Sequence, residues 1–471
     1  PNTHSDSYVK ELKNTVEEKA AGKQMIISSV KCPWKDSEGK ASIKTQTKSI
    51  YDYLQATIDE KNAGGLIYDD ADFVGAWDSF FDENGQAMSS LAIFAYAQGN
   101  QVDVSSYKDP WEYGGDTGLK DQKVTIKKVK GMSESSIRGM DISSYLALKK
   151  AGVKYHDYEG NETPLLKVLH DNGINYIRIR IWNDPFNADG ETYGGGGNDV
   201  STGVEIAKEA AQYDMKVLLD FHYSDYWADP GQQNKPDAWK NLSFDELKEA
   251  VHKYTYDVLY RLKIMDCVPD MVQIGNEIRS GMLFPDGAVP QYRQLAALVN
   301  EGIRAVRELL PETKVMIHLD QGGRYNCIMP WFDSMFNAGM LPIDAIGLSF
   351  YSFWHGTFMD LKDTMSRLIK LYNLPVYIVE TAHPWRHCNG EHISKELMET
   401  AGLDAGIAEQ KKSLEIIMQI AAEVSKDTGK TGVYYWEPVG VPGKGMGTWF
   451  ENMGMFDEHG RLCRAGMQSG L

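Results

Sequence analysis

The chain has 471 residues, too many for one ordinary domain but suited to a barrel of about 250 to 350 residues plus a module of about 100. Hydrophobic residues make up 42% and charged residues 24%, as expected for a globular protein with a large core. The net charge of -17 would repel nucleic acid and an anionic membrane surface, so a neutral substrate fits better than either of these partners.

The sequence contains no clear membrane, disulfide or zinc signal. No apolar run approaches the about 18 residues that a membrane-spanning helix needs. The first residues, P-N-T-H-S-D, lack signal-peptide character, although a chain trimmed to its mature part would look the same. The five cysteines are scattered without a C-x-x-C pair, so we expect mostly free thiols.

Residues 1–132 are expected to form a smaller, β-rich N-terminal module. An amphipathic helix near its start precedes short strand candidates, which are Met25–Val30, Leu66–Tyr68, Leu91–Tyr96 and Val124–Val129. The large aromatic residues of this region are Trp34, Trp77 and Trp111. An exposed tryptophan could stack on a sugar, but tryptophan is more often buried in a core. The module is therefore interpreted either as an accessory carbohydrate-binding domain or as a spacer.

From Ile137 onward, strand and helix patterns alternate, which predicts a parallel sheet with crossover helices. The strand candidates are Ile137–Ile142, Tyr176–Trp182, Lys216–Tyr223, Met271–Glu277, Lys314–Asp320, Ala345–Tyr351, Val376–Thr381 and Gly432–Glu437. Later helices are expected at Tyr292–Leu310, Phe358–Tyr372 and Ala408–Asp427. Residues 133–471 are thus predicted to form an α/β domain, a (β/α)8 TIM barrel.

Two helix starts are predicted in detail. Thr163 should be the N-cap of a helix with Pro164 in its first position. Ser243 and Glu246 have the spacing of a capping box at the start of a long helix.

Two of the predicted strands end in glutamate. Asn276 and Glu277 close the fourth strand, and Glu380 closes the seventh. In a parallel barrel the C-terminal strand ends carry the chemistry, so both carboxylates are placed to act on a substrate. Two carboxylates on one rim can cleave a glycosidic bond, one donating a proton and the other attacking or activating water. For either glutamate alone a structural salt bridge is an equal alternative, whereas the pair favours catalysis.

Strand alternation predicts which side chains face the barrel mouth. These are Arg178, Arg180, Trp182, Asp220, His222, Gln273, Gly275, Glu277, His318, Asp320, Ser349, Tyr351, Ile378, Glu380, Tyr434 and Trp436. Polar and aromatic groups are therefore expected to gather at one end of the barrel.

At these positions the sequence resembles the retaining glycoside hydrolases with (β/α)8 barrels, and specifically the endo-β-1,4-galactanases of glycoside hydrolase family 53. The motifs, in chain order, are R-G-M-D-I-S, I-R-I-R-I-W-N-D-P, D-F-H-Y-S-D-Y-W-A-D-P, Q-I-G-N-E-I, G-L-S-F-Y-S-F-W-H-G, I-V-E-T-A and Y-Y-W-E-P. The resemblance runs from about Ile137 to the end and does not cover residues 1–130.

The resemblance implies a role for each catalytic position. Glu277 would be the general acid/base and Glu380 the nucleophile, with the two carboxyl groups about 5 to 5.5 Å apart. Asn276 would bind the 2-hydroxyl of the sugar being cleaved. Arg178 or Arg180 would keep Glu380 ionised, and Arg180 is favoured because it lies nearer the strand end.

The resemblance also implies further substrate-binding residues. His222 and Tyr351 would line the same subsite, and Trp436 would be its floor. The remaining cleft residues, on loops after the third and sixth strands, would be Asp225, Trp227, Trp354 and His355.

No cofactor is expected, but a structural calcium ion is considered because bacterial members of the family often bind one. The available ligands in H-P-W-R-H-C-N-G-E-H are Asn389, Glu391 and His392, without an aspartate-rich run, whereas calcium needs six to eight oxygens. The implied partner is a β-1,4-galactan polysaccharide, bound by a secreted or cell-surface monomer. The alternatives are a related hydrolase of mannan or xylan, and a non-catalytic glycan-binding protein.

Overall fold

The structure, a computed structural model, describes residues 25–30, 46, 50 and 63–68 and most of the range 129–456. The gaps in that range are 158–159, 194–195, 385–392, 394–396, 399–401 and 441–452. By its internal contacts the chain divides into two compact units, Pro1–Lys127 and Lys128–Leu471.

The described part of the first unit is a pair of parallel strands, β1 (Met25–Val30) and β2 (Ala63–Tyr68). The first has the predicted bounds, and the second contains the predicted strand Leu66–Tyr68. The other predicted elements of this unit, and its three tryptophans, lie outside the described residues. Its β-rich character and its accessory role therefore stay predictions.

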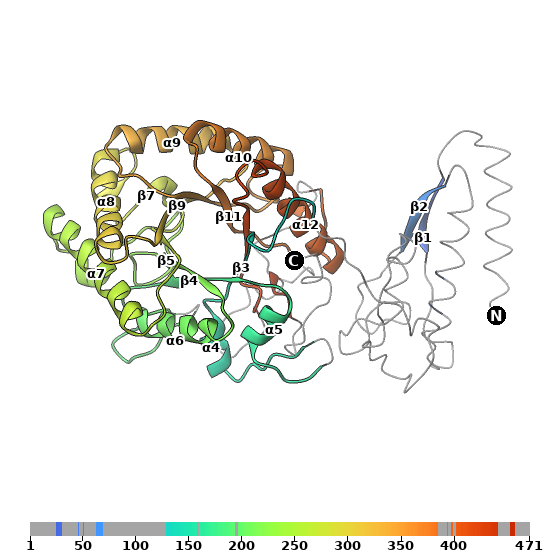
Figure 1. Cartoon of the computed structure of the whole chain (residues 1–471), viewed down its shortest axis with the longest axis horizontal. Helices are drawn as coiled ribbons and strands as arrows, with labels where there is room; N and C mark the ends of the chain where they lie inside the picture. Colours follow the sequence, from blue (N-terminus) through green and yellow to red (C-terminus); the bar gives the residue numbers. More distant parts are fainter. Residues whose placement is uncertain are drawn as a thin grey trace. The chain divides into compact units, whose positions relative to one another are not determined.

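The second unit is a closed barrel of eight parallel strands in the order β10-β11-β12-β3-β4-β5-β6-β9. Figure 1 shows the helices arranged around the outside of these strands. The predicted (β/α)8 fold is confirmed. Because all eight strands run in one direction, their C-terminal ends share one rim.

All eight predicted strands are present, but each ends one to three residues before its predicted end. Their bounds are β3 Ile137–Asp141, β4 Tyr176–Ile181, β5 Lys216–Phe221, β6 Met271–Ile274, β9 Lys314–Leu319, β10 Ala345–Ser349, β11 Val376–Glu380 and β12 Gly432–Trp436. The largest difference is at β6, where Gly275 and Glu277 have positive φ angles of 81° and 49°. Such angles end the extended ladder, so Asn276 and Glu277 belong to the loop on the rim.

The helices of the barrel follow the predicted alternation. Their bounds are α4 Tyr145–Lys150, α5 Leu165–Asp171, α6 Val200–Ala211, α7 Phe244–Ile264, α8 Tyr292–Leu309, α9 Tyr325–Asn337, α10 Phe358–Tyr372 and α12 Ile407–Val424. The capping box of Ser243 and Glu246 is present at the start of α7. The prediction for α5 was wrong by one residue, because Pro164, with ψ of 133°, is itself the non-helical N-cap.

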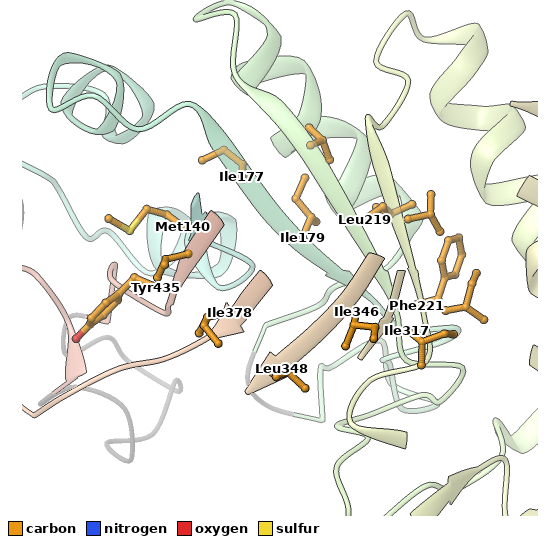
Figure 2. Packing of buried hydrophobic residues seen from close by; sticks show 14 of the residues in the cluster. Met140, Ile177, Ile179, Leu219, Phe221, Ile317, Ile346, Leu348, Ile378 and Tyr435 are labelled. Atoms are coloured by element: carbon orange, nitrogen blue, oxygen red, sulfur yellow. The ribbon is translucent and has the colours of Figure 1, made fainter. Parts of the chain in front are cut away.

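Side chains alternate between the inside of the barrel and the layer beneath the helices. The inner cluster consists of Ile137, Tyr176, Leu218, Met271, Met316, Ala345, Tyr377, Val379 and Tyr434. Figure 2 shows part of the outer layer, including Ile177, Ile179, Leu219 and Phe221. The Tyr434 ring fills the barrel so closely that a Cβ added at Gly139 would lie 2.0 Å from it. Because the inner cluster fills the barrel with apolar side chains, the polar groups available for chemistry lie at the C-terminal strand ends.

The expectations about membrane-spanning helices and about cysteines can be compared with the described residues only. No helix in the described part of the chain combines the length and apolar character needed to cross a bilayer. Of the five cysteines, Cys267 and Cys327 are described, and both are free thiols.

Candidate active site

Glu277 and Glu380 meet around the hydroxyl of Ser349, at the end of β10. The Ser349 Oγ lies 2.5 Å from Glu277 Oε1 and 3.5 Å from Glu380 Oε2. These two carboxylate oxygens are therefore at most about 6 Å apart, close enough for both carboxyl groups to reach one glycosidic bond. Two glutamates about a hundred residues apart in sequence thus face one small space.

A break in the strand alternation brings Glu380 into this space. Ile378 was predicted to share the mouth face with Glu380, and this prediction was wrong, because Ile378 packs in the outer layer while Val379 points inward. The pairing of β10 with β11 shifts here, from Leu348 opposite Ile378 to Ser349 opposite Glu380. The extra residue in β11 is a bulge, which lets Glu380 turn inward directly after Val379.

The environment of the two glutamates raises both pKa values. Enclosure of its carboxyl group, together with the negative charge of Glu380, raises the pKa of Glu277 well above its usual range. Burial also raises the pKa of Glu380, to about 7, although the Arg178 guanidinium opposes that shift. Among the described residues only Glu380 of the two has an arginine ion pair, so it is the better placed to be ionised while Glu277 holds a proton.

Arg178 is the arginine that pairs with Glu380, at 2.8 Å. The preference for Arg180 was therefore wrong. The Arg178 side chain is buried, and its guanidinium also contacts Asp141 at 2.7 Å and Asp220 at 2.8 Å. Carboxylates from β3 and β5 hold the guanidinium from both sides, so its position beneath Glu380 is fixed before a substrate binds.

Arg180 instead belongs to a neighbouring buried cluster further along β4, joined to the first through Asp141, which lies 4.0 Å from the Arg180 guanidinium. It pairs with Glu437 Oε1 at 2.5 Å, and the Ser144 hydroxyl donates to the same oxygen at 2.7 Å. Its guanidinium lies 4.1 Å from the centroid of the Trp227 ring. Arg180 thus supports an aromatic side chain of the cleft rather than the charge on Glu380.

A chain of hydrogen bonds leads through His318 to Glu277. Burial lowers the pKa of His318 well below its usual value, so one ring nitrogen donates and the other accepts. His318 Nδ1 lies 3.0 Å from both Gln273 Nε2 and Asn276 Oδ1, and His318 Nε2 lies 2.8 Å from Ser349 Oγ. The Ser349 hydroxyl donates to Glu277 Oε1, and this hydrogen bond stabilises the carboxylate form of Glu277.

The other predicted polar residues lie on the same rim, but most are bound to protein groups. Asn276 accepts from Arg178 at 2.9 Å and donates to the Ala228 carbonyl at 2.8 Å. The neighbouring His222 contacts Asp220 through Nε2, and its Nδ1 accepts from the Ala228 N–H. These bonds anchor the loop after β5 to the catalytic layer.

Asp225 and His355 brace the loops that carry them. The two carboxylate oxygens of Asp225 accept from the backbone N–H groups of Asp184 and Asp237, at 2.9 and 2.8 Å. His355 is buried against the Ser349 carbonyl at 3.0 Å, and burial lowers its pKa to about 4. The structure thus assigns both residues contacts within the protein.

Aromatic side chains surround the glutamates. The Tyr351 hydroxyl lies 3.4 Å from Glu380 Oε2, and burial raises its pKa well above the usual value, so it stays a donor. Trp354 is 40% exposed beside Tyr351. Trp436 and Trp227 are half-buried, with their ring centroids 6.3 Å apart. Aromatic residues that follow the third, sixth and eighth barrel strands therefore lie on the rim that carries the two glutamates.

The predicted calcium ligands Asn389, Glu391 and His392 lie outside the described residues. Among the residues that are described, no group of three or more His, Cys, Asp or Glu side chains is arranged to hold a metal ion. Calcium binding stays a prediction.

Four comparisons relate the chain to known proteins. The family model described as glycosyl hydrolase family 53 matches residues 137–467. An endo-beta-1,4-galactanase of Bacillus subtilis is 34% identical, covering 69% of this chain and 75% of that protein. An arabinogalactan endo-beta-1,4-galactanase A of Emericella nidulans is 32% identical, covering 69% and 91%. The solved GH53 catalytic domain of Ignisphaera aggregans is 37% identical with a TM-score of 0.70, covering 73% and 98%.

Proposed function

The chain belongs to glycosyl hydrolase family 53, and from this premise we propose that Glu277 is the acid/base and Glu380 the nucleophile of its reaction. The protein is a glycoside hydrolase that cleaves β-1,4-galactan internally, and hydrolysis in this family retains the anomeric configuration. The observation that carries the assignment is the meeting of two carboxyl groups around Ser349, with an arginine paired to only one of them.

The first step needs a proton on Glu277 and a negative charge on Glu380. Glu277 would donate its proton to the glycosidic oxygen while Glu380 attacks the anomeric carbon and forms a galactosyl ester. Arg178 and the Tyr351 hydroxyl, which contact separate oxygens of Glu380, would orient the attacking carboxylate. In the second step Glu277 would remove a proton from water, which then displaces Glu380.

Asn276 and Trp436 complete the proposed subsite for the cleaved sugar. Arg178 and the Ala228 carbonyl hold the Asn276 amide in place, and its second N–H is available for the sugar 2-hydroxyl. Trp436 follows the inward-facing Tyr434 and would offer its ring as the floor.

The natural substrate is proposed to be the galactan side chains of pectin, type I arabinogalactan, and the site of action to be outside the cell. A name given to a relative, arabinogalactan endo-beta-1,4-galactanase, supports the first point. A polymer of this size does not enter cells, which supports the second. A monomer suffices for this proposal, because every site residue named above comes from one chain.

Product analysis on potato galactan, with mannan and xylan as competing polymers, tests the substrate. Galactan alone should release reducing ends, first as long fragments and then as short oligosaccharides. Equal or faster release from mannan or xylan would assign a different β-1,4-glycan. Binding of galactan without release of reducing ends would indicate a glycan-binding protein.

Replacing Ser349 should change the pH dependence in a defined direction. Activity requires protonated Glu277, and the Ser349 hydroxyl lowers the pKa of Glu277 by donating to its carboxylate. Ser349→Ala should therefore raise that pKa and move the basic limb of the kcat/KM profile to higher pH. Initial rates on galactan between pH 4 and pH 10 measure the shift.

Ser349→Thr is the matched control, because it keeps a hydroxyl donor at this position. Its basic limb should stay close to that of the unchanged enzyme. A basic limb that does not move in Ser349→Ala, while the fold is retained by circular dichroism, would remove Glu277 from the role of acid.

A further inference from the structure

A row of aromatic rings leads from the catalytic centre to the protein surface. It begins at Trp436, whose backbone N–H donates to the carbonyl of Thr381, the residue after Glu380. The next ring is Trp227, 6.3 Å away between centroids, followed by Tyr226 at 6.4 Å and Tyr193 at 6.5 Å. The last two side chains, named here the outer tyrosine pair, are not used by the catalytic steps above.

The outer tyrosine pair is exposed. Tyr226 is 37% exposed and Tyr193 is 48% exposed, whereas Trp182, which contacts Tyr226, is fully buried. Exposed aromatic rings are uncommon in the described part of the chain, and two of them stand next to each other here. An adjacent pair of exposed rings that continues an aromatic row from the catalytic centre is typical of a binding surface.

The backbone that carries Tyr226 is held in place by two other segments of the chain. Asp225, its neighbour, accepts backbone N–H groups from Asp184 after β4 and from Asp237 in the 3-10 turn Asp237–Trp239. The Asn183 N–H donates to the Ser224 carbonyl at 2.8 Å. Binding on Tyr226 would therefore cost little backbone ordering.

The backbone of Tyr193 is also tied down. Its N–H donates to the Pro185 carbonyl at 3.1 Å, and the residues beside these two, Phe186 and Thr192, form an antiparallel bridge. The ring thus projects from paired backbone. The inner end of the row is fixed as well, since the Arg180 guanidinium lies against Trp227 and is itself paired with Glu437.

Successive rings in the row turn sharply. The interplanar angle is 57° between Trp436 and Trp227, 82° between Trp227 and Tyr226, and 82° between Tyr226 and Tyr193. Tilted and edge-to-face packing of this kind holds neighbouring rings against one another, so the position of each ring in the row is fixed by the next.

From this geometry we infer that the outer tyrosine pair binds further galactose residues of the same galactan chain, beyond those held at the catalytic glutamates. The inference rests on the proposed function. The tyrosine rings contact the apolar faces of the sugars, and the phenolic hydroxyls are available to sugar hydroxyls. The pair therefore selects long substrates and adds nothing for short ones.

The test compares a polymer with a substrate that is too short to reach the pair. Tyr226→Ala, Tyr193→Ala and the double variant are assayed on galactan and on an aryl β-1,4-galactobioside. For the double variant kcat/KM on galactan should fall about tenfold, mainly through KM, while kcat/KM on the galactobioside stays within about twofold. Tyr226→Phe keeps the ring and should retain most of the activity on galactan.

Tyr260→Ala on α7 is the matched control, because Tyr260 is 50% exposed and stacks on Tyr256 of the same helix. It should leave both activities unchanged. Equal losses on both substrates would indicate a purely structural role for the tyrosines, and unchanged galactan kinetics would show that no sugar binds there. Either result would overturn the inference but not the proposed function, provided that the unchanged enzyme hydrolyses galactan. If the unchanged enzyme is inactive on galactan, the proposed function itself is overturned.

Discussion

Glu380→Ala is expected to lower the rate of galactan hydrolysis by about four orders of magnitude or more, and azide is expected to restore turnover. Without its carboxylate the enzyme cannot form the galactosyl ester, so the double displacement stops at its first step. Alanine leaves space beneath the anomeric carbon, where azide can attack from the face opposite to the leaving group. Since Glu277 still donates its proton, an α-galactosyl azide should form, and NMR of the product measures its configuration.

Glu437→Gln is the control for this experiment. Glu437 also follows a barrel strand and is fully buried, but its partners are Arg180 and Ser144 rather than Arg178. Azide should not raise its activity or produce a glycosyl azide. An α-azide product from the Glu437 variant, or undiminished hydrolysis by Glu380→Ala, would contradict the assignment of the nucleophile.

The barrel could be predicted from the sequence because its signals are local. Each strand is a short apolar run followed by a helical pattern, and the run from Val376 to Val379 is a clear case. The C-terminal ends of the strands were less predictable, since they depend on backbone angles that the sequence pattern does not indicate. Glu277, in a left-handed conformation after β6, was assigned to a strand for this reason.

The partners of the charged residues could not be predicted in the same way. Arg178 and Arg180 share one face of β4, and proximity to the strand end favoured the wrong one. What decides between them is which carboxylates of other strands lie nearest, Asp141 and Asp220 within 2.8 Å of Arg178, and Glu437 at 2.5 Å from Arg180. These contacts join residues up to 257 positions apart, so only the closed barrel defines them.

Some residues of the site were identified in the sequence without their role being predicted. Ser349 and His318 were predicted to face the mouth, but nothing in their spacing indicated that they form one hydrogen-bond chain to Glu277. Glu437, in the motif Y-Y-W-E-P, was predicted only as the last residue of the eighth strand. The bulge in β11 could not be predicted, because it is defined by the pairing of β11 with β10 and not by the residue types of β11 itself.

Glu277→Ala should have an effect that depends on the leaving group. On galactan the departing sugar needs a proton, so activity should fall by about 10²- to 10⁴-fold, the usual range for loss of a general acid. A dinitrophenyl galactobioside needs no such help, because its phenolate leaves readily. On this substrate the first step should stay fast, and a burst of phenolate equal to the enzyme concentration should precede slow turnover. Stopped-flow absorbance measures the burst.

Azide distinguishes this variant from Glu380→Ala by the configuration of the product. With Glu380 intact the galactosyl ester forms, and azide then displaces it without needing a base, which water does need. Two displacements give a β-galactosyl azide, where the Glu380 variant gives the α form. An α product from Glu277→Ala, or equal losses on galactan and on the dinitrophenyl substrate, would mean that the two carboxylates around Ser349 have the reverse roles or that a third group supplies the proton.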